Sequence, residues 1–336
     1  MSELMYPVNK VPEQGQTIEL TDGVKWLRMP LFLKLDHINL YLIKDGDGWF
    51  VVDTGLKSSK VQKLWESIFE TELEGLPIKG IIVTHLHPDH VGQAGWLSRR
   101  WQVGIYMTQA EFMGTIIYMD TPSSRTDEYP VFFRNAGVPE DELSQMHVGG
   151  LDRLVEPMPR RYTRLSDNDC LAIGGREWRV IVGYGHSPEH ACLYCEELNV
   201  LISGDQVLPK ITPNISINSA EPDANLLESY LESLEKLKAL PEATFVLPAH
   251  NEPFTGLHKR LTDIQLHHEK KLDMIIAECK EPRLAVDLLG LLFGRELKGT
   301  EKMLGLGECL AHLNCLIHRG RLVRTLEEEQ HWYKTI

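Results

Sequence analysis

Three histidines and an aspartate fall within residues 85–90 (HLHPDH), and this motif constrains the chain more than any other feature. Residues 80–84 (GIIVT) before it have the pattern of a short buried strand, and residues 92–101 after it that of a helix. Alternate side chains of an extended segment point the same way, so His85 and His87 can face a common point. The motif therefore indicates a metal site on a loop fixed by a sheet. A solvent-exposed turn that binds nothing is the alternative.

Three further residues of ligand type each follow a predicted strand later in the chain: His186, Asp205 and His250. Strand ends gather at one edge of an α/β layered fold, which is where binding sites form. Together with the motif at 85–90, these residues could fill two adjacent metal positions. Imidazole nitrogens and carboxylate oxygens without a thiolate suit zinc, and they also suit iron or manganese.

The order of strand and helix patterns predicts an α/β layered architecture. A hairpin is expected over residues 36–52, and strand and helix patterns alternate after it. Residues from about 109 to 160 change to helical spacing broken by a Pro/Ser/Asp-rich stretch, which predicts a helical insertion between two sheet-forming halves. From residue 256 the pattern is helical, with helices expected over 257–279, 283–293 and about 301–318, up to a two-stranded hairpin near the C-terminus. We therefore predict two domains, 1–255 and 256–336.

The charge balance and the hydropathy exclude several classes of protein. Asp and Glu outnumber Lys and Arg by 48 to 35, and an acidic surface repels phosphate backbones, which argues against a nucleic-acid partner. No apolar run approaches the roughly 20 residues of a membrane span. The N-terminal residues lack the pattern of a secretory signal, and six cysteines do not form a disulfide scaffold, so we expect a reducing, cytoplasmic setting.

The motifs in this order resemble those of the metallo-β-lactamase-fold superfamily of binuclear hydrolases. Residues 84–90 (THLHPDH) match its signature T-H-x-H-x-D-H, and four shorter motifs follow its order: VVDTG at 51–55, GHSPEH at 185–190, SGD at 203–205 and PAH at 248–250. The resemblance covers residues of about 25–255 and implies an αββα sandwich. Residues 256–336 resemble the winged-helix appendage of one branch, which includes a mitochondrial endoribonuclease and many uncharacterised bacterial hydrolases.

The resemblance also implies a role for each ligand-type residue. One metal would be held by His85, His87 and His186, the other by Asp89, His90 and His250, and Asp205 would bridge both. Asp53 would orient the ligands by hydrogen bonds, as a ligating imidazole needs its other nitrogen fixed. His190 is a second candidate for a place behind the ligands, although a histidine satisfied by backbone at a strand start would have the same pattern. We expect two divalent ions, zinc first, with iron or manganese as alternatives.

The expected activity follows from the metals. Water bound between two divalent ions gives a bridging hydroxide at neutral pH, which would attack a carbonyl or phosphoryl centre, and Asp89 would orient it. Similarity to hydroxyacylglutathione hydrolases favours a small thioester or other ester-like acyl substrate, with a lactone as a close variant. A phosphodiesterase or ribonuclease, suggested by the C-terminal segment, and a metal-bound sensor or binding protein are the alternatives.

Two further segments have open roles. Apolar residues of the insertion, including Phe112, Met119, Phe132 and Phe133, either pack helices together or form a lid that receives an acyl chain. For residues 256–336 we favour a structural role or the formation of a homodimer, with a contribution to the wall of the substrate pocket.

Overall fold

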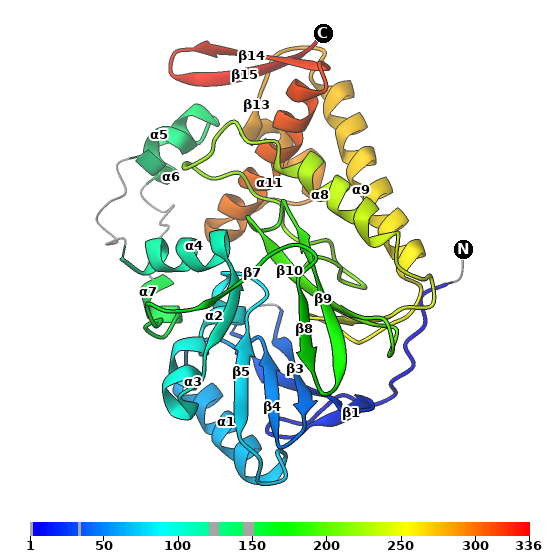
Figure 1. The fold of residues 1–336 in the computed structure, drawn as a ribbon. Helices are drawn as coiled ribbons and strands as arrows, with labels where there is room; N and C mark the ends of the chain where they lie inside the picture. The colour runs from blue at the N-terminus through cyan, green and yellow to red at the C-terminus, as the bar shows by residue number, and fades with distance from the viewer. Residues whose placement is uncertain (1–2, 33–34, 121–127, 144–150) are drawn as a thin grey trace.

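Two β-sheets lie face to face in the computed structural model, which describes residues 3–32, 35–120, 128–143 and 151–336 (Figure 1). The first sheet has seven strands in chain order: β1 (Ile18–Thr21), β2 (Val24–Pro30), β3 (His37–Asp45), β4 (Gly48–Val52), β5 (Ile78–Ile82), β6 (Ile105–Thr108) and β7 (Thr163–Leu165). The second has five strands in the order β12 (Phe245–Pro248), β11 (Val200–Gly204), β10 (His190–Cys195), β9 (Arg176–Gly183) and β8 (Cys170–Ile173).

Both sheets are mixed. The strands β1 to β4 are antiparallel, and β4 to β7 run parallel because helices connect them. In the second sheet only the β11–β12 pair is parallel. The expected hairpin between β3 and β4 closes at the pair Asp45–Gly48. Neither the pair β1–β2 nor the pair β6–β7 was predicted from the sequence.

Alternation along the inner strands produces the layers. In β2, Trp26 packs between the two sheets, whereas its neighbour Leu27 packs on the outer face of the first sheet. The outer face is covered by α1 (Ser59–Thr71) and α3 (Ala94–Trp101), and Trp65 of α1 is fully buried there. The outer face of the second sheet is covered by α8 (Leu226–Leu237). The predicted αββα sandwich is therefore confirmed.

Helices lie between β6 and β7, where the insertion was predicted: α4 (Gln109–Asp120), α5 (Glu128–Asn135), α6 (Glu140–Leu143) and α7 (Leu151–Leu154). Residues 121–127 and 144–150 of that prediction lie outside the described residues. Because β7 pairs with β6, the helices interrupt the first sheet and do not separate two halves. Phe112 stacks on Tyr162 with 3.9 Å between ring centroids, so this aromatic residue packs in the interior.

The C-terminal segment contains helices and a small sheet of three strands: α9 (Leu257–Glu278), β13 (Arg283–Leu284), the 3-10 turn η1 (Ala285–Leu288), α10 (Leu289–Phe293), α11 (Gly299–His318), β14 (Leu322–Glu327) and β15 (Gln330–Thr335). The predicted hairpin is β14–β15. The prediction of a continuous helix over 283–293 was wrong at its start. Residues 283–284 form the strand β13 instead, because they pair with β15 near the end of the chain.

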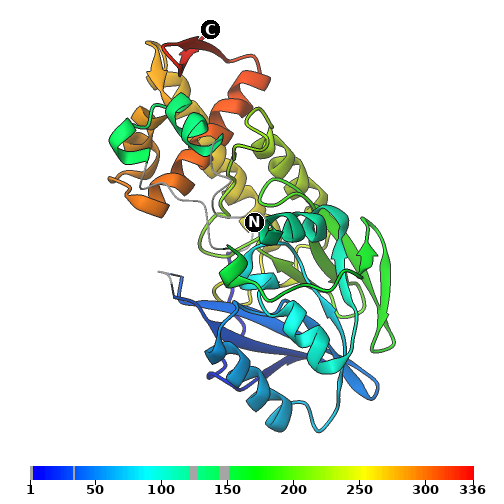
Figure 2. The same ribbon diagram turned by 90° about the vertical axis from the view of Figure 1, so that its left-hand side faces the viewer.

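The C-terminal helices share one apolar cluster with the second sheet and α8. Leu261 of α9 and Leu306 of α11 belong to the same buried cluster as Tyr230 of α8 and Phe133 of α5. In Figures 1 and 2 these helices and the hairpin lie at one end of the molecule, and the first sheet lies at the other. The division at residue 255 and the winged-helix likeness stay predictions.

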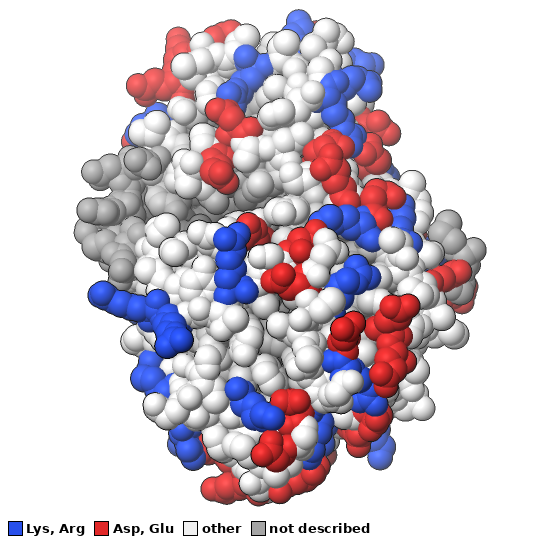
Figure 3. Space-filling view, viewed as in Figure 1, with Lys and Arg blue, Asp and Glu red and all other residues white. Residues whose placement is uncertain are grey.

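The outer surface shows no separation of charge on the face drawn in Figure 3, where acidic and basic side chains are interspersed. Among the described helices, none combines the length and the apolar character that crossing a bilayer would need.

Two buried histidines meet where α9 and α11 pack together. His312 donates from Nδ1 to the carbonyl of Glu308 (2.8 Å), which leaves its Nε2 to accept from Nδ1 of His268 at 3.1 Å. The remaining nitrogen of His268 is buried without a partner among the described residues. Burial lowers the pKa of His312 to about 4 and that of His268 to about 2, so both rings are neutral in the folded protein at neutral pH.

These histidines predict a loss of stability in mild acid. An unfolded histidine has a pKa of about 6.5, so the unfolded chain binds more protons than the folded chain as the pH falls from about 6.5 toward 4. Stability is therefore full above about pH 6.5 and declines below it, by about 2 kcal/mol per histidine at pH 5. In urea titrations at pH 8 and pH 5, His312→Gln should reduce this loss. His258→Gln, on α9 outside the pair, is the control, and an identical loss in wild type and His312→Gln would contradict the prediction.

Candidate metal centre

The structure brings all seven predicted ligand residues to one edge of the sandwich, in two adjacent groups. The first group is His85, His87, His186 and Asp205, and the second is Asp89, His90 and His250. Within each group the ligand atoms lie within 4.8 Å of one another. The residues come from the loop after β5, the helix α2 (Pro88–Val91), and the loops after β9, β11 and β12. Strand ends therefore converge as the sequence predicted.

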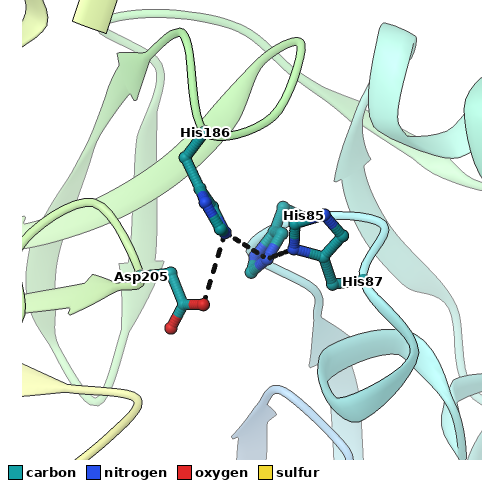
Figure 4. Close-up of side chains that lie close together, drawn as sticks. All are labelled: His85, His87, His186 and Asp205. Atoms are coloured by element: carbon teal, nitrogen blue, oxygen red, sulfur yellow. Dashed lines mark hydrogen bonds and ion pairs between the residues drawn. The ribbon is translucent and has the colours of Figure 1, made fainter. Parts of the chain in front are cut away.

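The first group consists of three imidazole nitrogens and a carboxylate oxygen that point toward one another (Figure 4). Nε2 of His85 lies 2.8 Å from Nδ1 of His87 and 3.3 Å from Nε2 of His186. Nε2 of His186 also lies 3.3 Å from Oδ2 of Asp205. His186 donates from its other nitrogen to the carbonyl of Asn214 (2.8 Å), so in the neutral ring its Nε2 carries a lone pair.

The second group shares Asp205 with the first. Oδ1 of Asp205 lies 3.3 Å from Nε2 of His250 and 3.6 Å from Nε2 of His90. Asp89 completes the group, with its Oδ2 3.5 Å from the same nitrogen of His250. One oxygen of Asp205 therefore faces each group, which is the geometry that a bridging ligand requires.

Unpaired polar atoms show that this arrangement fits cations. Nε2 of His90 and Oδ1 of Asp205 are buried and have no hydrogen-bond partner in the described structure. Buried polar atoms without a partner are rare in native proteins, and an ion is a common reason for them. A cation would satisfy both atoms as well as the facing lone pairs of the imidazoles. The two clusters therefore fit a binuclear metal centre.

The electrostatics favour the ligating forms in the first group. Burial and the neighbouring imidazoles hold the pKa of His85 and His87 well below the ordinary value, and neutral imidazole is the form that binds a metal. Burial opposes the charge on His90, but Asp53, Asp89 and Asp205 raise its pKa well above the ordinary value. Such an excess of buried carboxylate around one imidazole attracts positive charge.

Asp53 lies at the end of β4 and touches two parts of the ligand loop. Its Oδ1 accepts from the backbone N–H of Thr84 (2.8 Å), and its Oδ2 accepts from Nδ1 of His90 (2.8 Å). The backbone of Asp53 has a φ of 60°, a conformation that few residues other than glycine adopt. These contacts have the form of the orienting role that the sequence predicted.

His190 lies behind the ligands and outside both groups. Its Nε2 accepts from the backbone N–H of Asp205 (3.1 Å), and its ring stacks on that of His85 with 4.7 Å between centroids. Burial lowers its pKa to about 3. His190 was predicted either to lie behind the ligands or to be satisfied by backbone. Its contact is to a backbone N–H, and that N–H belongs to the candidate ligand Asp205. His190 and Asp53 are both buried, and each forms a hydrogen bond to a candidate ligand residue.

One residue in this region had no signal in the sequence. Glu111 in the first turn of α4 is buried and accepts from the N–H of Leu86 (2.9 Å), the hydroxyl of Ser187 (2.6 Å) and the N–H of Glu189 (2.6 Å). It therefore links the loop of His85 to the loop of His186. Glu111 belongs to no motif, and only the tertiary structure shows its partners.

An apolar cavity of about 230 Å³ lies beside the first group and includes His87 in its lining. Its wall comes from α4, α5, the loop at 216–218 and α11, through residues that include Met119, Phe132, Phe133, Ile217 and Met303. The insertion and the C-terminal segment thus both contribute to the wall of this cavity. Phe112 packs in the interior and is not part of it.

The comparisons with known proteins agree with this geometry. Residues 33–250 match the family described as Metallo-beta-lactamase superfamily, and residues 272–336 match Metallo-beta-lactamase-like, C-terminal domain. A beta-lactamase domain protein from Burkholderia ambifaria has a crystal structure with 40% identity and a TM-score of 0.93, covering 99% of this chain and 98% of that one.

Two more distant relatives have nearly the same length. A metallo-beta-lactamase family protein from Thermus thermophilus is 27% identical with a TM-score of 0.80, over 95% of this chain and all of that one. A Bacillus subtilis protein named "Probable metallo-hydrolase YqjP" is 23% identical over 94% of this chain and 99% of its own length. The chain described here therefore belongs to the metallo-beta-lactamase superfamily and carries the C-terminal domain that accompanies it.

Proposed function

We propose that this protein is a metal-dependent hydrolase that cleaves a small thioester or other ester-like acyl substrate. The observation that carries the proposal is the apolar cavity beside His87, because it joins a space suited to an acyl chain to a ligand of the metal centre. The name of the Bacillus subtilis relative supports hydrolysis in general and does not specify the bond.

Two divalent ions at such a centre supply a hydroxide at neutral pH and polarise the oxygen of the substrate. The donor set is compatible with zinc, our first choice, and with iron or manganese. Within the chain, Asp89 is the more accessible of the two ligand carboxylates, with a side chain 23% exposed against 10% for Asp205. We therefore assign to Asp89 the orientation of the nucleophile, and to Asp205 the link between the two groups.

The cavity supplies binding and excludes water from one side of the centre. Leu86 and His87 are adjacent in the chain and both contribute to its lining, so an acyl chain in the cavity would have its carbonyl end near the ligands. A thiolate leaves without a strong general acid, and no such acid is assigned here. A lactone is a close variant of the same chemistry.

The alternative of a phosphodiesterase or ribonuclease has less support. Basic residues near the C-terminus would have to meet a phosphate backbone, yet Arg319 pairs with Glu228 at 2.7 Å and Arg324 pairs with Asp223 at 2.7 Å. The sensor alternative gains nothing from the site, since all seven ligand-type residues are in place. The cytoplasmic setting stays a prediction that cell fractionation can test. The homodimer stays a prediction that sedimentation can test.

A substrate panel tests the proposed activity. The metal-loaded protein should release thiol from acyl-CoA or acylglutathione substrates, measured with a thiol dye, and Asp89→Asn should lower the rate by at least about 100-fold because it disturbs the centre directly. A labelled single-stranded RNA is tested in parallel. RNA cleavage that depends on Asp89, without release of thiol, would reverse the order of the two hypotheses.

The cavity predicts a dependence on chain length. Each methylene that enters it should contribute about 0.8 kcal/mol, so KM should fall about fourfold per methylene until the cavity is full. Met303→Trp fills part of the space and should shift the optimum to shorter acyl chains, as measured by kcat/KM over a series of chain lengths. Leu266→Trp, on the exposed face of α9, is the matched control. An unchanged length profile in Met303→Trp would show that the acyl group binds elsewhere.

A further inference from the structure

A chain of polar contacts leads from the metal ligand His186 into the C-terminal helices. Nδ1 of His186 donates to the carbonyl of Asn214 (2.8 Å). The side-chain amide of Asn214 donates to Oε2 of Glu308 on α11 (3.2 Å). The other oxygen of that carboxylate accepts from Nζ of Lys271 on α9 (2.7 Å). These contacts connect a predicted ligand with two helices that lie far from it in the sequence.

The carboxylate in this chain of contacts is fixed on both sides. The side chains of Lys271 and Glu308 are 11% and 10% exposed, so their ion pair is nearly shielded from water. Nζ of Lys271 also lies 4.8 Å from the ring centroid of Phe293. A buried pair of this kind is a weak source of net stability, but it defines one orientation for each partner. Glu308 therefore presents its second oxygen to Asn214 in one position.

The loop that contains Asn214 is also held to α11 through its backbone. The N–H of Ile217 donates to the carbonyl of Gly307 at 3.0 Å. A Cβ atom on Gly307 would lie 1.9 Å from Oγ of Ser216 and 2.9 Å from the carbonyl oxygen of Ile217. Only glycine permits this approach of helix and loop. The side chain of Glu308 and the backbone of Gly307 thus hold the loop from adjacent positions of one helix.

Other ion pairs join the C-terminal helices to the rest of the protein without reaching a ligand. Arg319 of α11 pairs with Glu228 of α8, and both side chains are about one-third exposed. Lys302 of α11 pairs with Glu142 of α6. These contacts hold the helices in place at positions away from the loop at 214–217. The contact through Asn214 therefore differs from these ion pairs, because it leads to a candidate metal ligand and they only attach the C-terminal helices to the rest of the protein.

We infer that Glu308 is a positioning residue for the metal centre: by holding the side chain of Asn214 it fixes the position of the backbone carbonyl that orients the ring of His186, so that the C-terminal helices contribute to metal affinity. A ligating histidine binds best when its second nitrogen donates to a fixed acceptor, and loss of that partner typically costs about 10- to 100-fold in affinity. This inference goes beyond the proposed substrate, since it concerns only the binding of metal.

The test measures zinc binding by the full-length protein in competition with a fluorescent chelator. Glu308→Leu removes the nearer acceptor of the Asn214 amide and leaves only the carbonyl of Leu304 at 3.5 Å. Because the backbone carbonyl that accepts from His186 is itself retained, the site of His186 should weaken by up to about 10-fold. Glu308→Gln keeps the shape of the side chain but only one of its two acceptor oxygens, and it should weaken the site less than Glu308→Leu. Glu228→Gln removes the charge from an ion pair between α8 and α11 that lies away from the loop, and it should leave zinc affinity unchanged.

A second variant covers the case in which Glu308→Leu does not fold. Gly307→Ala pushes a methyl group against Ser216 and should also weaken zinc binding, with the thermal midpoint of the metal-free protein recorded for every variant. Equal affinity in wild type, Glu308→Leu and Gly307→Ala would overturn the inference, and so would an equal loss in Glu228→Gln. Because zinc binding requires no substrate, these results do not depend on which ester the protein cleaves.

Discussion

The arrangement of the site depends on the contacts of the Asp205 carboxylate. It lies between His186 of one group and His250 of the other, and it is nearly buried. A buried carboxylate is costly unless charge or hydrogen bonds compensate it. Here the compensation comes from imidazoles on separate loops. The arrangement of these groups also fits cations, which would satisfy Oδ1 of Asp205, an oxygen without a hydrogen-bond partner among the described residues. The strand ends therefore have to converge for two reasons: the fold brings them to one edge, and the buried charge of Asp205 needs the imidazoles that they carry.

Residues behind the ligands fix this convergence in several directions. Asp53 holds the ligand loop through Thr84 and His90, and Glu111 joins that loop to the segment around Ser187. His190 holds the backbone of Asp205. Each contact links segments that are well separated in the chain. A ligand cluster built in this way keeps its geometry because each loop is anchored to another, and not only to its own strand.

The helix α11 unites two properties that would otherwise be independent. Met303 on this helix contributes to the wall of the apolar cavity, and Glu308 further along it contacts Asn214 behind His186. The shape of the cavity and the orientation of a ligand thus depend on the same rigid element. In the cluster around Leu306, the helix also shares its packing with α8 and the second sheet. The C-terminal segment is therefore part of the site, although its own sequence carries no ligand motif.

A layered α/β fold and the candidate ligand residues could be predicted from local patterns in the amino-acid sequence, whereas the αββα sandwich was implied by the resemblance of its motifs to those of a known superfamily. Strand patterns of period two and a motif such as HLHPDH can be recognised from a few consecutive residues. The ends of the strands then meet at one edge because of the geometry of a sheet. Other features emerged only from packing: the pairing of β13 with β15, the buried acceptor Glu111, and the path from Glu308 to His186. These features join residues with long separations and common side chains. Nothing in their spacing distinguishes them from ordinary surface carboxylates and loops until the folded chain brings them together.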